Sequence, residues 1–128
     1  MEKGKIDTTF SEAFKLRTRR HSVATIKFLK TIAPNEEMYV IKRQLIKSAT
    51  SVAANYRATC RAKSKADFIS KLGIVHEEAD ETLFWYEVLE DLDYTSPELL
   101  NLKKESDEIL RIVAKSISTS RGNFYNKN

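Results

Sequence analysis

Apolar residues recur at spacings of three and four over most of the chain, which is the period of an amphipathic helix. Three such stripes are continuous enough to predict the inward face of a helix. The first holds Met38, Ile41, Leu45, Ala49, Val52 and Tyr56. The second holds Phe68, Leu72, Val75, Ala79, Leu83 and Tyr86. The third holds Leu99, Leu102, Ser106, Ile109, Val113 and Ile117.

Start and stop signals divide the chain into four helices. Asn35 is a candidate N-cap, Ser64 begins a sequence similar to a capping box, and Ser96 precedes a proline at the first helical position. Pro34 marks the end of the helix before Asn35. We therefore predict helices at about 9–32, 36–60, 65–91 and 97–120, with a polar tail at 121–128.

The connections between these helices are short, so neighbouring helices are expected to lie antiparallel. The chain has only 3 Gly and 2 Pro, too few for the many turns of a sheet protein. With 128 residues it fits one domain. The sequence predicts a single all-α domain over residues 1–128, an antiparallel up-down-up-down four-helix bundle.

The predicted third helix carries more apolar residues than one core can bury. At about 100° per residue, a second stripe falls nearly opposite the first. It consists of Ile74, Trp85, Val88 and Leu92, and Phe84, next to Trp85, adds to the same apolar surface. A large exposed apolar surface usually marks an interface, so we predict self-association or docking of a partner helix there. The alternative is that other parts of the same chain cover this side.

Charge is divided unequally along the chain. Residues 1–75 hold 16 Lys/Arg and 6 Asp/Glu, a balance of +10, whereas residues 76–128 hold 6 and 12, a balance of −6. The two sum to the net charge of +4. Either the two halves pair in the folded chain, or one surface is basic and available for binding.

The predicted second helix carries a basic stripe away from its apolar one. Arg43, Lys47, Arg57 and Arg61 form it, and Lys63 and Lys65 continue it into the next connection. Rows of cations suit the phosphates of RNA or DNA, so these six residues are the predicted nucleic-acid contacts. The alternatives are a solvated face, or ion pairs with Glu77, Glu78, Asp80 and Glu81. Regular interleaving with exposed aromatics, typical of single-strand binding, is missing.

No pattern in the sequence predicts catalysis, a metal site, a cofactor or a small-molecule substrate. The run from His76 to Glu81 lacks the repeated Glu-x-x-His motif of di-iron bundles and the H-E-x-x-H pattern of zinc enzymes. Arg57, Arg61 and Lys63 would lower the pKa of the Cys60 thiol, but no histidine is near it in sequence. His21, within a basic run, is expected at the surface. We predict a protein that is not an enzyme.

A single cysteine fits a reducing compartment, and no apolar run approaches the length of a membrane span. The first ten residues lack the apolar stretch of a signal peptide. We expect a cytoplasmic protein that does not enter the membrane.

Two segments resemble a known family. Residues 44–68, from Gln44 to Phe68, and residues 78–85, from Glu78 to Trp85, are similar to the four-helix-bundle proteins of intervening sequences in bacterial large-subunit rRNA genes. Asn55-Tyr56-Arg57-Ala58 places the chain with one branch of that family. The resemblance implies bacterial origin, no known catalytic activity and a ring of subunits, most simply a pentamer. A similar bundle is a basic pentameric accessory protein of retroelement reverse transcriptases.

Two functions follow from these patterns. The first is a homo-oligomer that is not an enzyme and binds structured RNA or DNA through its basic surface. The second is a protein–protein adaptor, in which the second apolar stripe receives a partner's helix and the cations only pair with acids.

Overall fold

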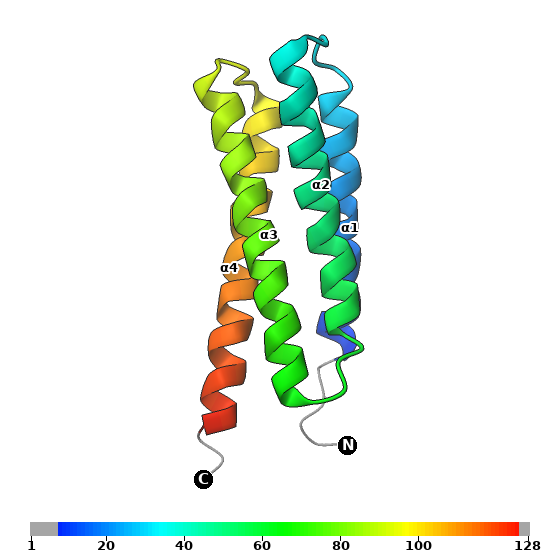
Figure 1. Ribbon diagram of the computed structural model, residues 1–128, viewed down its shortest axis with the longest axis vertical. Coiled ribbons are helices and arrows are strands. Elements are labelled where there is room, and N and C mark those ends of the chain that lie inside the picture. The colour runs from blue at the N-terminus through cyan, green and yellow to red at the C-terminus, as the bar shows by residue number, and fades with distance from the viewer. Residues whose placement is uncertain (1–7, 126–128) are drawn as a thin grey trace.

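The computed structural model describes residues 8–125, and four α-helices make up most of this part of the chain. They are α1 (Thr8–Leu29), α2 (Glu36–Thr59), α3 (Lys65–Asp91) and α4 (Pro97–Tyr125). In Figure 1 the chain rises in α1, descends in α2, rises in α3 and descends in α4. Each helix packs against the next, and α4 packs against α1, so α1 and α3 are diagonal. The predicted all-α four-helix bundle is confirmed.

The three predicted helix starts with capping residues have the expected hydrogen bonds. The side chain of Asn35 accepts a hydrogen bond from the backbone N–H of Met38 at 2.8 Å. Ser64 accepts one from the N–H of Asp67 at 3.0 Å, and Ser96 one from the N–H of Leu99 at 3.1 Å. These side chains satisfy N–H groups that have no partner within the first helical turn.

Two helix ends differ from the prediction. Helix α1 stops at Leu29, before the expected residue 32, because Thr31 and Ile32 bond back in tight turns to Phe28 and Leu29. Helix α4 continues to Tyr125, so the predicted polar tail is helical over residues 121–125. No proline stops it there, and polarity alone does not end a helix. Residues 1–7 and 126–128 lie outside the described part.

Two apolar clusters fill the core, one toward each end of the bundle. The cluster near the α1–α2 and α3–α4 connections holds Phe28, Leu29, Met38, Ile41, Leu45, Tyr86, Leu89, Leu99 and Leu102. The other holds Phe14, Val52, Tyr56, Leu72, Val75, Ala79, Ile109 and Val113. The inward stripes read from the sequence supply most of both clusters. None of the described helices is long and apolar enough to cross a membrane.

A layer of buried polar side chains lies between these clusters, and every helix contributes to it. Its members are His21, Ser22, Thr25, Ser48, Thr82 and Ser106. The sequence-based placement of His21 at the surface is wrong, since its side chain is only 7% exposed. The neighbouring basic residues suggested an exposed position, but His21 lies on the side of α1 that faces the interior of the bundle.

Hydrogen bonds in this polar layer tie α1 to each of the other helices. Nε2 of His21 lies 3.2 Å from the carbonyl oxygen of Leu102 in α4 and 3.3 Å from the hydroxyl of Tyr86 in α3. The same tyrosine hydroxyl is hydrogen-bonded to Thr25. Ser22 donates to the carbonyl oxygen of Ala49 in α2 at 2.8 Å. Buried polar groups are thus satisfied across helices, which fixes the position of α1 in the bundle.

The burial of His21 predicts that the protein loses stability in mild acid. Burial lowers the pKa of His21 below its usual 6.5, against opposing effects of Leu102 and Glu105. The unfolded chain therefore binds a proton at this site more readily than the folded chain does. The free energy of unfolding should fall as the pH drops through 6.5, measured by urea unfolding at a series of pH values.

The matched variants are His21→Gln and His76→Gln, which each remove one of the two histidines. The pH dependence between neutrality and the range in which carboxylates titrate should disappear in His21→Gln and persist in His76→Gln. Identical pH profiles for His21→Gln and the parent protein would contradict this account.

Candidate nucleic-acid interface

An open groove of about 750 Å³ runs between α1 and α2 on the outside of the bundle. The α1 side is lined by Glu12, Lys15, Leu16, Arg19, Ser22, Val23 and Ile26. The α2 side is lined by Thr50, Ala53, Ala54, Arg57 and Arg61. The groove thus has an apolar floor with small residues and a rim of cations.

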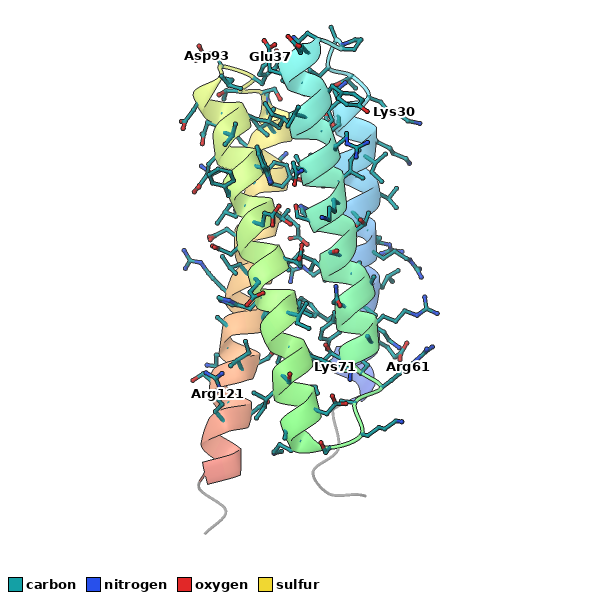
Figure 2. All side chains as sticks on the ribbon, in the orientation of Figure 1. Lys30, Glu37, Arg61, Lys71, Asp93 and Arg121 are labelled. Atoms are coloured by element: carbon teal, nitrogen blue, oxygen red, sulfur yellow. The ribbon has the colours of Figure 1, made fainter. Side chains whose placement is uncertain are left out.

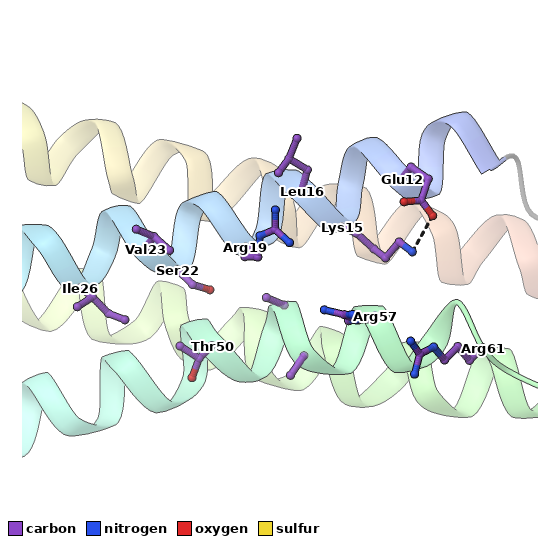
Figure 3. Close-up of a pocket in the computed structure, with 12 residues that line it drawn as sticks. Glu12, Lys15, Leu16, Arg19, Ser22, Val23, Ile26, Thr50, Arg57 and Arg61 are labelled. Carbon is purple, nitrogen blue, oxygen red and sulfur yellow. Dashed lines mark ion pairs between the residues drawn. The ribbon is translucent and has the colours of Figure 1, made fainter.

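Four of the lining residues are cations, and they come from both helices. Figure 3 shows Lys15 and Arg19 on α1 along one side of the groove, and Arg57 on α2 and Arg61 just after the end of α2 along the other. Lys15 is paired with Glu12 at 2.7 Å. The three arginines are exposed and form no ion pair with another described residue. They are available to an anion from outside.

The six predicted contacts divide into three places on the surface. Arg57 and Arg61 line the groove. Arg43 and Lys47 are exposed farther along α2, and the guanidinium of Arg43 lies 5.5 Å from the ring centre of Tyr39. Lys63 follows α2 in the connection, and Lys65 is the first residue of α3. The structure brings Arg57 and Arg61 together with Arg19, and the other four extend the basic surface beyond the groove.

Pairing between the basic and acidic halves is limited to one site among the described residues. Arg17 of α1 binds Glu105 of α4 at 2.6 Å and Glu108 at 2.8 Å. Arg17 is not one of the six predicted nucleic-acid contacts, so this pairing uses none of them. Hydrogen bonds with these carboxylates raise the pKa of Arg17, and Arg17 lowers that of Glu105. Ion pairing among the described residues therefore leaves the three groove arginines, Arg19, Arg57 and Arg61, without a carboxylate partner.

The acids of α3 do not pair with the basic stripe either. Burial raises the pKa of Glu78, and the neighbouring Glu81 raises it further, while Lys47 is close enough only to oppose this effect. None of Glu77, Glu78, Asp80 and Glu81 forms an ion pair with another described residue. The ion pairs that the sequence offered as an alternative do not form.

The second apolar stripe of α3 is partly covered by the chain itself. Ile74, Phe84 and Leu92 are 45%, 51% and 46% exposed. Trp85 and Val88 are half-buried against the core cluster, and the indole N–H of Trp85 donates to Glu81 at 3.2 Å. The stripe therefore exposes about half of each of three apolar side chains and a smaller part of Trp85 and Val88.

Sequence reasoning missed the apolar outer side of α1. Leu16, Val23 and Ile26 line the groove, and Val23 is 46% exposed. The seven-residue spacing of Leu16 and Val23 was the available signal. The described part of the chain contains no group of three or more His, Cys, Asp or Glu residues able to hold a metal ion.

The structure defines the class of protein as a four-helix bundle with a basic groove between its first two helices. Residues 14–115 match the model of the 23S rRNA-intervening sequence protein family. The chain belongs to this family, as the resemblance in residues 44–68 and 78–85 predicted. No curated protein matches it.

A similar solved structure is that of a protein of unknown function of the S23 ribosomal protein family, from Bacteroides thetaiotaomicron. The two chains are 30% identical, with a TM-score of 0.73 over 81% of this chain and 97% of the other. The solved structure has a similar fold, and neither comparison indicates a catalytic family.

The environment of Cys60 predicts an unreactive thiol. Burial raises the pKa of Cys60 above its usual 9.0, although Tyr56 and Lys15 act in the opposite direction. The expected lowering of this pKa by Arg57, Arg61 and Lys63 is wrong, since none of the three is a cause of the shift. Because the thiolate is the reactive form, alkylation by iodoacetamide at neutral pH should be slower than for free cysteine.

Cys60 is the only cysteine, so mass spectrometry of the alkylated chain reports on this thiol alone. The rate should rise toward that of free cysteine when the protein is unfolded in urea. Faster alkylation in the folded protein than in the unfolded one would show that the surrounding cations outweigh burial.

Proposed function

We propose that this protein is not an enzyme and that it assembles with copies of itself and binds the phosphates of structured RNA or DNA through its basic surface. The observation that carries the proposal is the α1–α2 groove, where Arg19, Arg57 and Arg61 have no carboxylate partner in residues 8–125. Unpaired cations on both sides of a groove attract a polyanion and release its counterions.

The length and the chemistry of the basic surface favour a double-helical region. Arg43 and Arg57 are 14 residues apart on α2, or about 21 Å along the helix axis at 1.5 Å per residue, and Arg61 lies just beyond the end of this helix. None of the residues that line the groove is aromatic, so it offers no platform on which unpaired bases could stack. Contacts to phosphates alone would be made with little regard to base sequence.

Self-assembly is supported by the outer side of α3. Three large apolar side chains there, Ile74, Phe84 and Leu92, are about half exposed. An assembly that buried them would remove them from water and place several basic grooves in one particle. A ring of five copies is the arrangement that the family resemblance implies. Several grooves in one particle would raise the affinity for a long polyanion through multivalency.

The adaptor hypothesis rests on the same side of α3 but leaves the groove without a role. Under that hypothesis the α3 stripe receives a helix of another protein, and the isolated chain remains a monomer. The mass of the protein in solution separates the two functions, since self-assembly gives a multiple of the 14.7 kDa subunit.

Reversal of charge in the groove should weaken binding to nucleic acid. In Arg57→Glu/Arg61→Glu two groove cations become anions, and both side chains are exposed, so the fold should tolerate the change. We expect at least a tenfold loss of affinity, on the order of 1.4 kcal/mol, for two duplex RNAs of unrelated sequence. The slope of log K against log salt should become shallower by about 2. Fluorescence anisotropy between about 50 and 200 mM salt measures both quantities.

Lys104→Glu/Lys115→Glu on α4 is the matched control. It makes the same change in net charge at two exposed lysines of α4, outside the groove. This variant should keep most of the affinity of the parent protein. Equal losses of affinity in the two variants would mean that net charge, and not the groove, determines binding. Binding that does not depend on salt would exclude phosphate recognition.

A further inference from the structure

The outer side of α1 has two parts with different surroundings. One part faces α2 and forms the basic groove. The other lies toward α4 and has two shallow hollows of about 300 and 460 Å³. We define the α1 docking face by six residues that line these hollows: Ala13, Leu16, Arg20, Val23, Ala24 and Lys27. It combines apolar and small side chains with two exposed cations.

The outer side of α3 has the opposite charge. From Gly73 to Asp91 this helix has no Lys or Arg, and its exposed charged residues are Glu77, Asp80, Glu87 and Asp91. None of these four forms an ion pair with another described residue. We define the α3 docking face by Ile74, Glu77, Phe84, Val88, Asp91 and Leu92. Phe84 packs edge-on against Trp85, with ring centres 5.0 Å apart, which holds its ring in place at the surface.

Neither docking face is suited to pair with itself. Two α3 docking faces would bring unpaired carboxylates together, and two α1 docking faces would bring Arg20 and Lys27 against the same residues of another copy. Like charges that meet at an interface are unfavourable and exclude such pairings. An α3 docking face against an α1 docking face instead joins acids to bases and apolar side chains to hollows floored by alanines.

The geometry points to a head-to-tail contact in which the α3 docking face of one copy packs on the α1 docking face of the next. This inference rests on the proposed self-assembly and specifies which surfaces meet. The two helices are diagonal in the bundle. Each subunit can therefore contact one neighbour through its α3 docking face and another through its α1 docking face. Such a heterologous contact repeats from copy to copy and either closes into a ring or grows into a filament.

The two faces are also similar in length. Residues 74 to 92 span about 27 Å of α3, and residues 13 to 27 span about 21 Å of α1, at 1.5 Å per residue. The basic groove shares Leu16 and Val23 with the α1 docking face, and Lys15 and Ile26 lie on its α2 side. Figure 2 shows nitrogen-tipped side chains extending from the α1–α2 edge, with Lys30 and Arg61 labelled near its two ends. Docking there would cover the shared α1 edge of the groove and leave Arg57 and Arg61, on its other side, exposed.

Two variants, each defective in one face, test this contact. Val23→Asp places a charge on the α1 docking face, and Phe84→Asp does so on the α3 docking face. Both residues are about half exposed, and circular dichroism verifies that each variant is helical. Light scattering should give the subunit mass for each variant alone. An equimolar mixture should form a dimer of twice the 14.7 kDa subunit mass, because one intact face of each kind remains.

Leu100→Asp is the control, since Leu100 on α4 is 44% exposed and lies on neither face. It should assemble like the parent protein. A mixture of Val23→Asp and Phe84→Asp that stays monomeric while the parent protein assembles would overturn the head-to-tail contact but leave self-assembly standing. A monomeric parent protein would overturn both. A parent protein that assembles but does not bind nucleic acid would overturn only the proposed phosphate-binding function, and this comparison uses the parent protein because Val23 also lines the groove.

Discussion

The hydrogen-bonded layer around His21 is the constraint on which the rest of the bundle depends. It lies between two apolar clusters and joins α1 to Leu102, Tyr86 and Ala49 on the other three helices. A sliding or rotation of α1 would leave buried polar groups without partners, at about 1–3 kcal/mol for each group. The apolar clusters supply most of the driving force for folding, but apolar contacts alone tolerate changes in register. The polar layer makes one register of α1 lower in free energy than the registers next to it.

This layer also explains why α1 has apolar residues on its outer side. The inward positions in the middle of the helix are occupied by Thr18, His21, Ser22 and Thr25, which are all buried. The apolar residues Leu16, Val23 and Ile26 of the same turns consequently line a groove at the surface. A helix with buried polar residues and exposed apolar residues is unfavourable in a monomer, because apolar surface stays in contact with water. Such a helix is more stable when its outer side contacts something outside the subunit.

The sequence was sufficient for the fold because its signals were local and repeated. The three inward stripes, the caps at Asn35, Ser64 and Ser96, and the shortage of glycine and proline each pointed to the same bundle. The end of α1 was missed because tight turns after Leu29 leave no strong signal. The candidate site was only half predicted. The cations of α2 form a visible stripe, but their grouping with Arg19 depends on how α1 packs beside α2. The burial of His21 likewise depends on three other helices, and no pattern in α1 alone reveals it.

The division of charge is hard to explain by the stability of a single subunit. Exposed ion pairs contribute about 0–1 kcal/mol, so a chain gains little by forming them and loses little by leaving its charges apart. The balance of +10 in residues 1–75 and −6 in residues 76–128 does, however, set the field around the molecule. In a monomer the acids of α3 would repel the same polyanion that the α1–α2 groove attracts. A contact that places these acids against Arg20 and Lys27 of a neighbour removes that repulsion and leaves Arg57 and Arg61 exposed. Assembly and phosphate binding would then favour one another through electrostatics alone, and the acidic half of the chain would have a function that a lone basic bundle does not need.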